Sequence, residues 1–324
     1  MPKGHLLNSI IKKDDEYYTQ LKDIENELQH YLECFIDKVV FLPCDNPSFS
    51  NFWKYFVDNF KKLNLKELHA TYIEMGGGCS YHWIYDGDKI KKFPLNGNGD
   101  FRSDECIEIL KNCDIVVTNP PFSIFIEFFS WIIDQNKDFL ILGSQTKVAS
   151  GKVWEFVKDK KVFSGINYGT MCFTTPIKQE LKSLSNIVWF QNLKKNERCI
   201  TSRTLFDEIK YEKFVNYDAI NVNRIKDIPC DYGGIMGVPL TIFLYNLDEY
   251  DIIGIGVGNR CQYTNNKKME ILKNGKPTGK FTFNAKQSLY VKYNSEKHKN
   301  ATFKDLESKE LYYQPFTRVL IRKR

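Results

Sequence analysis

The sequence predicts an α/β protein in which a doubly wound, mostly parallel sheet is followed by a β-rich C-terminal region. Up to about residue 194, short apolar runs alternate with stretches of helical periodicity, a spacing typical of parallel βαβ units. Beyond that point the helical periodicity fades, and short strand-like runs separated by turn residues replace it. We therefore expect a ligand-binding domain at residues 1–194 and a smaller domain at 195–324, part of which could complete the first domain's sheet.

The first domain begins with two predicted helix–strand pairs. Apolar residues at helical spacing predict a helix within residues 20–36, and the apolar run 38–42 predicts a strand after it. Ser50 can cap a second helix. The apolar face of that helix carries Phe52, Phe56, Phe60 and Leu63. Residues 68–74 form the second predicted strand.

The middle of the first domain continues this alternation after an interruption. Residues 75–99 are a glycine-rich excursion that contains the aromatic, strand-like run 81–85. Ser103 can cap a helix over 104–113, which leads into an apolar strand at 114–118. The remaining predicted elements are a helix at 123–134, a strand at 139–143, a helix at 152–160 and a strand at 187–193.

The second domain is predicted to be β-rich and basic. Its strand-like runs are 240–244, 251–255, 280–283, 288–293 and 318–322, with turns at Asn274-Gly275 and Asn294-Ser295. Residues 258–324 hold 16 Lys and Arg against 5 Asp and Glu, whereas the first 257 residues hold 30 against 35. This asymmetry favours a polyanionic partner, and the alternative is a solvated, lysine-rich surface.

Composition excludes several classes of protein. No apolar stretch approaches the roughly 20 residues that span a bilayer, and the N-terminal residues show no signal-peptide core. The nine cysteines show no CxxC spacing and the five histidines are isolated, so we predict reduced thiols and no metal site. These features predict a cytoplasmic protein without a membrane partner.

The tetrapeptide Asn119-Pro120-Pro121-Phe122 is the most informative motif in the chain. It follows the apolar strand at 114–118, and ligands of doubly wound sheets bind at such carboxyl ends. The Asn119 side-chain oxygen and the Pro120 carbonyl can each accept one N–H of a planar amine, and Phe122 can stack on its ring. The motif therefore predicts methyl transfer to the exocyclic nitrogen of adenine; the alternative is an ordinary strand-to-helix turn.

A methyl donor would bind beside this notch, at the ends of the neighbouring strands. Asp45-Asn46-Pro47 occupies the donor-binding position after the first strand but lacks the usual Gly-x-Gly, so an Asx turn with a helix cap is the alternative. Glu74 could hold ribose hydroxyls, or lie on the surface. Asp100 could accept the donor's adenine amine, with Phe101 as an aromatic wall, or simply cap the next helix.

A second glycine-rich segment resembles the missing donor-binding turn. Gly254-Ile-Gly256-Val-Gly258 follows an apolar run, as in circularly permuted adenine methyltransferases. Residues 259–275, however, lack the amphipathic helix that should follow. We therefore predict a glycine-rich strand or bulge at this position.

Taken together, the motifs resemble one family, the EcoRI-type adenine-N6 DNA methyltransferases. The resemblance rests on Asp15-Glu-Tyr-Tyr-Thr-Gln20, Cys44-Asp45-Asn46-Pro47, Gly97–Arg102, Asp114–Phe122, Ile235–Thr241 and Arg318–Arg322. These segments extend over nearly the whole chain. The family also lacks the Gly-x-Gly turn, which removes the objection to Asp45-Asn46-Pro47.

The resemblance implies a Rossmann-like methyltransferase fold, S-adenosylmethionine as donor and an adenine flipped out of duplex DNA. It further implies a type II modification enzyme beside a cognate restriction endonuclease, and we expect a monomer. It assigns Tyr17, Tyr18 and Thr19 to the donor's methionine part, although Tyr17 stands where the family has Phe. The alternatives are an RNA or protein-glutamine methyltransferase, or a catalytically silent DNA-binding module.

Overall fold

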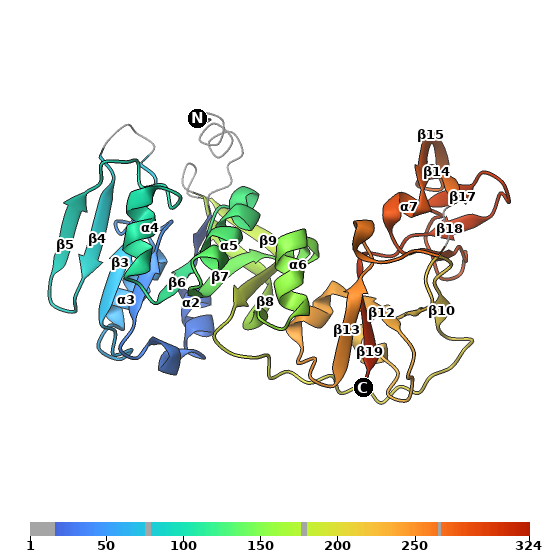
Figure 1. The fold of residues 1–324 in the computed structure, drawn as a ribbon, viewed down its shortest axis with the longest axis horizontal. Coiled ribbons are helices and arrows are strands. Elements are labelled where there is room, and N and C mark those ends of the chain that lie inside the picture. The colour runs from blue at the N-terminus through green and yellow to red at the C-terminus, as the bar shows by residue number, and fades with distance from the viewer. Residues whose placement is uncertain (1–16, 75–78, 176–179, 265–266) are drawn as a thin grey trace. The chain divides into compact units, whose positions relative to one another are not determined.

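The computed structural model describes residues 17–74, 79–175, 180–264 and 267–324 (Figure 1). Asp15 and Glu16 of the N-terminal motif, and residues 75–78 of the predicted glycine-rich excursion, lie outside these ranges. The chain divides into two compact units, Met1–Asn196 and Glu197–Arg324.

The first unit is built on a nine-stranded sheet of order β1-β8-β9-β7-β6-β2-β3-β4-β5. The four central strands, β7, β6, β2 and β3, are parallel, and the strands on either side of them pair antiparallel. The strands are β1 (Tyr18–Thr19), β2 (Val39–Leu42), β3 (Glu67–Ala70), β4 (Tyr81–Tyr85), β5 (Ile90–Pro94), β6 (Ile115–Thr118), β7 (Asp138–Ser144), β8 (Phe163–Thr174) and β9 (Leu181–Gln191). Among the described residues no strand of the second unit joins this sheet.

Helices cover both faces of this sheet (Figure 1). The helices are α2 (Leu21–Leu28), α3 (Asn51–Asp58), α4 (Asp104–Lys111), α5 (Phe125–Asp134) and α6 (Gly151–Lys158), with 3-10 turns η1 (Leu32–Phe35), η2 (Phe122–Ile124) and η3 (Gln145–Ala149). Because side chains alternate along a strand, Val40 and Leu42 face α2 and α3, and β2 presents Phe41 to the opposite face. On that opposite face, Phe129 of α5 packs against Phe139 of β7. The predicted mixed α/β architecture is confirmed.

The two predicted helix caps are also confirmed. The Ser50 hydroxyl accepts from the backbone N–H groups of Phe52 and Trp53 at 3.1 and 3.2 Å, which begins α3. The Ser103 hydroxyl accepts from Cys106 N–H at 3.3 Å and begins α4. Helix α3 ends at Asp58, before two of the apolar residues assigned to its face.

The strand order places a topological switch point between β2 and β6. From β2 the chain crosses through α3 to β3 on one side, and after α4 it returns to form β6 on the other side of β2. The carboxyl ends of β2 and β6 therefore diverge into separate loops, which carry Asp45 and Asn119. Open α/β sheets bind ligands at this position.

The antiparallel strands β8 and β9 were not predicted as such. Strand β8 was missed, and β9 begins six residues before the predicted strand at 187–193 and runs antiparallel to β7. The register of β8 shifts after Ser164, where Glu27 of α2 accepts from the backbone N–H groups of Ile166 and Asn167, both at 2.8 Å. A fully buried carboxylate thus replaces the missing ladder partners.

The second unit contains two five-stranded sheets, of order β10-β11-β12-β19-β13 and β15-β14-β17-β18-β16. The first is formed by β10 (Glu212–Lys213), β11 (Ile220–Asn221), β12 (Met236–Pro239), β13 (Tyr250–Ile255) and β19 (Arg318–Lys323). The second is formed by β14 (Lys268–Lys273), β15 (Lys276–Phe283), β16 (Val291–Lys292), β17 (Phe303–Asp305) and β18 (Leu311–Tyr313). Its short helices are η4 (Ile225–Asp227), η5 (Leu240–Leu244), η6 (Gly258–Arg260) and α7 (Asn284–Gln287). The predicted β-rich C-terminal region is confirmed.

Individual strands of this region were predicted less well. The predicted strand at 240–244 is wrong: these residues form the 3-10 helix η5 after Pro239. Only Val291–Lys292 of the predicted run 288–293 is a strand. The glycine-rich segment begins in β13, which includes Gly254 and Ile255 and has a register shift between Ile252 and Gly254, whereas Gly258 begins the 3-10 helix η6.

Candidate functional site

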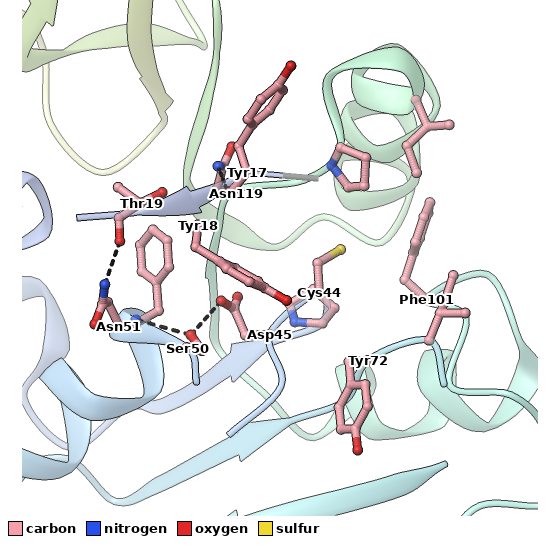
Figure 2. Close-up of a pocket in the computed structure, with 15 residues that line it drawn as sticks. Tyr17, Tyr18, Thr19, Cys44, Asp45, Ser50, Asn51, Tyr72, Phe101 and Asn119 are labelled. Carbon is pink, nitrogen blue, oxygen red and sulfur yellow. Dashed lines mark hydrogen bonds between the residues drawn. The ribbon is translucent and has the colours of Figure 1, made fainter. Parts of the chain in front are cut away.

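A pocket that is partly open to solvent lies at the carboxyl ends of β2 and β6 (Figure 2). Its lining residues are Tyr17, Tyr18, Thr19, Pro43, Cys44, Asp45, Ser50, Asn51, Phe52, Tyr72, Ile73, Phe101, Asn119, Pro121 and Ile124. Aromatic walls and a few convergent polar groups make it a binding site for a partly aromatic, partly polar ligand.

Asn119 presents an acceptor atom with no partner. Its side-chain Nδ2–H donates to the backbone carbonyl of Tyr17 at 2.8 Å. This bond fixes the amide so that Oδ1 points elsewhere, and Oδ1 is buried without a hydrogen-bond partner in the described part of the chain. A buried, unpaired acceptor is costly, so the site is built to receive an N–H donor.

Strand β1 supplies a second unpaired oxygen. The Thr19 hydroxyl lines the pocket and is buried without a hydrogen-bond partner among the residues described. The strand is held in place because Thr19's carbonyl accepts from Asn51 Nδ2 at 2.8 Å (Figure 2). It also pairs antiparallel with β8, so the segment expected to contact the donor is part of the sheet.

The motif's aromatic ring lies beside the pocket in a cluster of three rings. The centroid of Phe122 is 5.6 Å from that of Tyr17 and 6.1 Å from that of Phe173. The Lys182 ammonium donates to the Tyr17 hydroxyl at 2.8 Å and restrains its ring. Phe122 itself is half-buried and does not line the pocket.

Asp45 ties the two diverging strand ends together. Its Oδ1 accepts from the Ser50 hydroxyl and its Oδ2 from the Thr118 hydroxyl, both at 2.6 Å. Thr118 is the last residue of β6 and Ser50 caps α3, so this carboxylate closes the base of the crevice. Burial raises the pKa of Asp45 to about 6, although both hydrogen bonds oppose the shift.

Asp45→Asn should change how stability depends on pH. A carboxyl whose pKa is raised by folding contributes stability below its unfolded pKa, and this contribution is lost as pH rises through about 6. From pH 5 to pH 7.5, the unfolding free energy of the wild type should therefore fall by roughly 1 kcal/mol relative to that of the variant. Urea unfolding at both pH values measures this, and a wild-type-minus-variant difference independent of pH would contradict the assigned pKa.

Tyr72 forms the wall opposite β1. Burial raises the pKa of the Tyr72 hydroxyl. The charge of Glu74 and a hydrogen bond to the Glu74 side chain also raise this pKa, whereas a hydrogen bond with the Asn46 side chain lowers it. Gly99 packs against this wall with φ +77°, and a Cβ there would lie 2.0 Å from the Tyr72 carbonyl oxygen. Strand β3 ends at Ala70, so Glu74 follows the strand by four residues and does not end it as predicted.

Of the two predicted site residues in the loop before α4, one lines the pocket and the other does not. Phe101 lines the pocket and is fixed from behind by Phe128 and Trp131, at centroid distances of 4.9 and 5.1 Å. Asp100 lies outside the pocket lining, and its carboxylate is ion-paired with Arg102.

The fold thus brings together about half of the predicted site residues. Those that line the pocket are Tyr17, Tyr18, Thr19, Asp45, Phe101, Asn119 and Pro121, and those adjacent to it are Asn46, Pro47, Glu74, Asp100, Pro120 and Phe122. Sequence reasoning did not select Asn51, Tyr72 or Cys44 as pocket residues. Asn51 had a usable signal, since it follows a helix-capping serine at the expected donor-binding turn.

Two kinds of feature are absent from the described residues. Within the described ranges, no group of three or more His, Cys, Asp and Glu side chains could hold a metal ion. No helix in those ranges has the length and apolar character needed to cross a membrane. The sheet order thus defines a mixed α/β protein with a pocket at its switch point, the position where open α/β sheets bind ligands.

Comparison with known proteins identifies the family. The family model described as adenine-specific methyltransferase EcoRI matches residues 6–324. Type II methyltransferase M.EcoRI of Escherichia coli is 38% identical over 298 residues, covering 78% of this chain and 91% of that protein. Type II methyltransferases M.MgeORF184P of Mycoplasma genitalium and M.MpnI of Mycoplasma pneumoniae are 36% and 37% identical over 267 and 272 residues. These two matches cover 74% and 77% of this chain, and 83% and 85% of the relatives.

The chain therefore belongs to the EcoRI family of adenine-specific methyltransferases. The resemblance drawn from its motifs is confirmed. No solved structure gave a significant match.

Proposed function

We propose that this adenine-specific methyltransferase transfers a methyl group from S-adenosylmethionine to N6 of an adenine flipped out of a specific duplex DNA sequence. The observation that carries the proposal is the buried Oδ1 of Asn119, which lines the pocket and has no hydrogen-bond partner among the described residues. Family membership supplies the reaction, and this atom supplies the acceptor that the reaction needs.

The pocket suits a donor that joins an aromatic base to a polar, charged tail. Phe101 and Tyr72 offer flat apolar surfaces for the base, as predicted for Phe101. The unpaired Thr19 hydroxyl and the adjacent Tyr17 and Tyr18 are assigned to the amino-acid tail. The bound donor would supply an electrophilic methyl group on a sulfonium.

Four residues assigned to the donor, Asn46, Pro47, Glu74 and Asp100, lie next to the pocket and do not line it. Glu74 and Asn46 approach it through the Tyr72 hydroxyl, so we assign them to the ribose side, with Pro47 shaping the turn. Asp100 is assigned to the donor's adenine amine, and its ion pair with Arg102 would hold the carboxylate in place.

At the notch, Asn119 acts by holding the adenine amine. The N6 lone pair is delocalised into the ring, so adenine is a weak nucleophile until the nitrogen becomes pyramidal. Asn119 Oδ1 and the Pro120 carbonyl would each accept one N6–H, which favours that geometry and fixes the direction of attack. The methylated nitrogen then loses a proton to these acceptors or to water. No separate carboxylate base is required.

Phe122 and Pro121 complete the proposed notch. A base in a duplex cannot reach the end of a sheet, so it must leave the stack at a cost of a few kcal/mol. Stacking on Phe122, whose ring is backed by Tyr17 and Phe173, would offset part of that cost. The rigid Pro121 sets the angle between the ring and the acceptors.

The two compact units support a division of labour. We assign donor binding and catalysis to residues 1–194 and target recognition to residues 195–324, where positive charge is concentrated. The names of the relatives support a type II modification enzyme. We further propose that it acts as a monomer, beside an endonuclease of the same specificity.

The decisive experiment compares acceptors. Purified protein with radiolabelled S-adenosylmethionine should label duplex DNA and not RNA or protein, and sequencing of DNA from a host that expresses it should show N6-methyladenine in one short sequence context. Label in RNA or in a protein glutamine would replace the proposal with one of those activities. Failure to bind the donor would indicate a silent DNA-binding module.

A further inference from the structure

Strands β14 and β15 form a hairpin at one edge of the second sheet of this unit. Strand β17 pairs with β14 from Met269 to Ile271 and the Leu272 N–H donates to the Thr302 carbonyl at 2.8 Å, so the hairpin extends past these contacts from Lys273 and is closed by the turn at Asn274-Gly275. Strand β15 is the edge of the sheet, and nearly all of its residues are exposed. A ribbon of this kind has the width to enter the major groove of DNA.

The hairpin carries many more positive than negative side chains. Residues 267–287 contain six lysines and a single acidic residue, Glu270. Lys267 is ion-paired with Asp305, whereas Lys273, Lys276 and Lys280 make no ion pair with any described residue. Exposed lysines that the protein does not neutralise are available to phosphates.

One face of this small sheet presents two exposed phenylalanines. Phe281 and Phe283 lie opposite Glu270 and Lys268, whereas Thr282 lies opposite the fully buried Met269. Because paired residues share a face of the sheet, both phenylalanines point away from the core, and they are 53% and 56% exposed. Lys280 precedes Phe281 on the strand, and the ammonium of Lys268, which lies opposite Phe283, is 5.8 Å from the centroid of the Phe281 ring, so positive charge borders the two rings.

A strained turn ends the strand. Asn284, Ala285, Lys286 and Gln287 all have left-handed φ values, of 43, 50, 60 and 57°. This conformation is unfavourable for residues with a Cβ, and surrounding contacts hold it: Ala285 is fully buried, and the Tyr263 hydroxyl donates to the Gln287 carbonyl at 2.6 Å. The turn exposes the side chains of Lys286 and Gln287. Strain of this kind concentrates at functional sites.

We propose that the hairpin of residues 268–287 is the element that enters a groove of the substrate duplex. Lys273, Lys276 and Lys280 contact phosphates, and the face with Phe281 and Phe283 lies against base edges, where phenylalanine can contact thymine methyl groups. Gln287, at the strained turn, is placed to contact a base. This inference rests on the proposed function, since it assumes a DNA substrate.

The first test removes the three phosphate contacts. Lys273→Gln/Lys276→Gln/Lys280→Gln should lower the slope of log affinity against log salt by about 2 to 3, and weaken binding of a fluorescein-labelled DNA duplex on the order of 100-fold at moderate salt. The matched control is Lys61→Gln/Lys62→Gln/Lys66→Gln, which removes the same charge before β3, at the opposite edge of the sheet from the pocket. Circular dichroism and urea unfolding check that both compact units of each variant are folded.

The second test addresses the apolar face. Phe281→Ser/Phe283→Ser should leave the salt slope unchanged and reduce the ratio of specific to non-specific affinity at least tenfold. Sedimentation measures whether this face instead joins two copies of the chain: a wild-type dimer that the variant dissociates would overturn the proposal. A lysine variant with wild-type affinity and slope would also overturn it. If the wild type itself fails to bind or methylate DNA, the proposed function is wrong, and the two failures are thereby distinguished.

Discussion

Replacing Asn119 by Ala should lower the rate of methyl transfer on the order of 10³-fold while leaving donor affinity within about threefold of the wild type. The change removes Oδ1, the buried acceptor that has no partner among the described residues, and it removes the bond to the Tyr17 carbonyl. Single-turnover transfer to duplex DNA measures the chemical step, and calorimetry measures donor binding.

A matched variant separates the two roles of this side chain. Asn119→Asp keeps an acceptor oxygen but places a carboxylate against the Tyr17 carbonyl, so its activity should fall between those of the wild type and the Ala variant. Near-normal turnover in Asn119→Ala would show that the adenine amine is held elsewhere. Equal losses of donor affinity and of rate would instead indicate a collapsed pocket.

Glu27→Ala should destabilise the first unit by about 3 to 5 kcal/mol, a large part of the stability of an ordinary domain. The carboxylate is fully buried and accepts from the Ile166 and Asn167 backbone N–H groups, the Asn167 side chain and the Tyr31 hydroxyl. Ala leaves these donors unpaired at the register shift of β8. Urea unfolding followed by tryptophan fluorescence measures the effect.

Two controls accompany this variant. Glu25→Ala changes an exposed glutamate on the same helix and should alter stability by no more than about 0.5 kcal/mol. Glu27→Gln keeps one acceptor oxygen but points an N–H₂ group at donors, so its loss should be intermediate. Equal stabilities for Glu27→Ala and Glu25→Ala would mean that the buried bonds contribute nothing.

Features set by local chemistry could be predicted from the sequence. Ser50 and Ser103 were identified as caps because a hydroxyl followed by an apolar helical pattern has one local solution. The site could be predicted for a similar reason: Asp45 and Asn119 follow apolar strands, and the carboxyl ends of parallel strands share one edge.

Features set by distant partners could not be predicted. Glu27 is of a residue type that usually lies on the surface, and its acceptor role depends on backbone N–H groups 139 and 140 residues away. The apolar residues 240–244 are compatible with either a strand or a helix. In the structure they form a 3-10 helix that follows Pro239 and buries Ile242 and Phe243. Antiparallel β8 exposes Ile166 and Tyr168 and buries Ser164 and Gly165, so an alternation of apolar and polar residues did not reveal it.

The bond between Asn119 and the Tyr17 carbonyl joins segments 102 residues apart. The two ends of a carboxamide have nearly the same shape, and only this bond distinguishes them. If the segment preceding β1 is displaced, the group can turn over and present hydrogens to an amine that also carries hydrogens. The enzyme would then be inactive although every catalytic residue is still present. A chimaera between relatives should therefore take the segment around Tyr17 and the segment around Asn119 from the same parent.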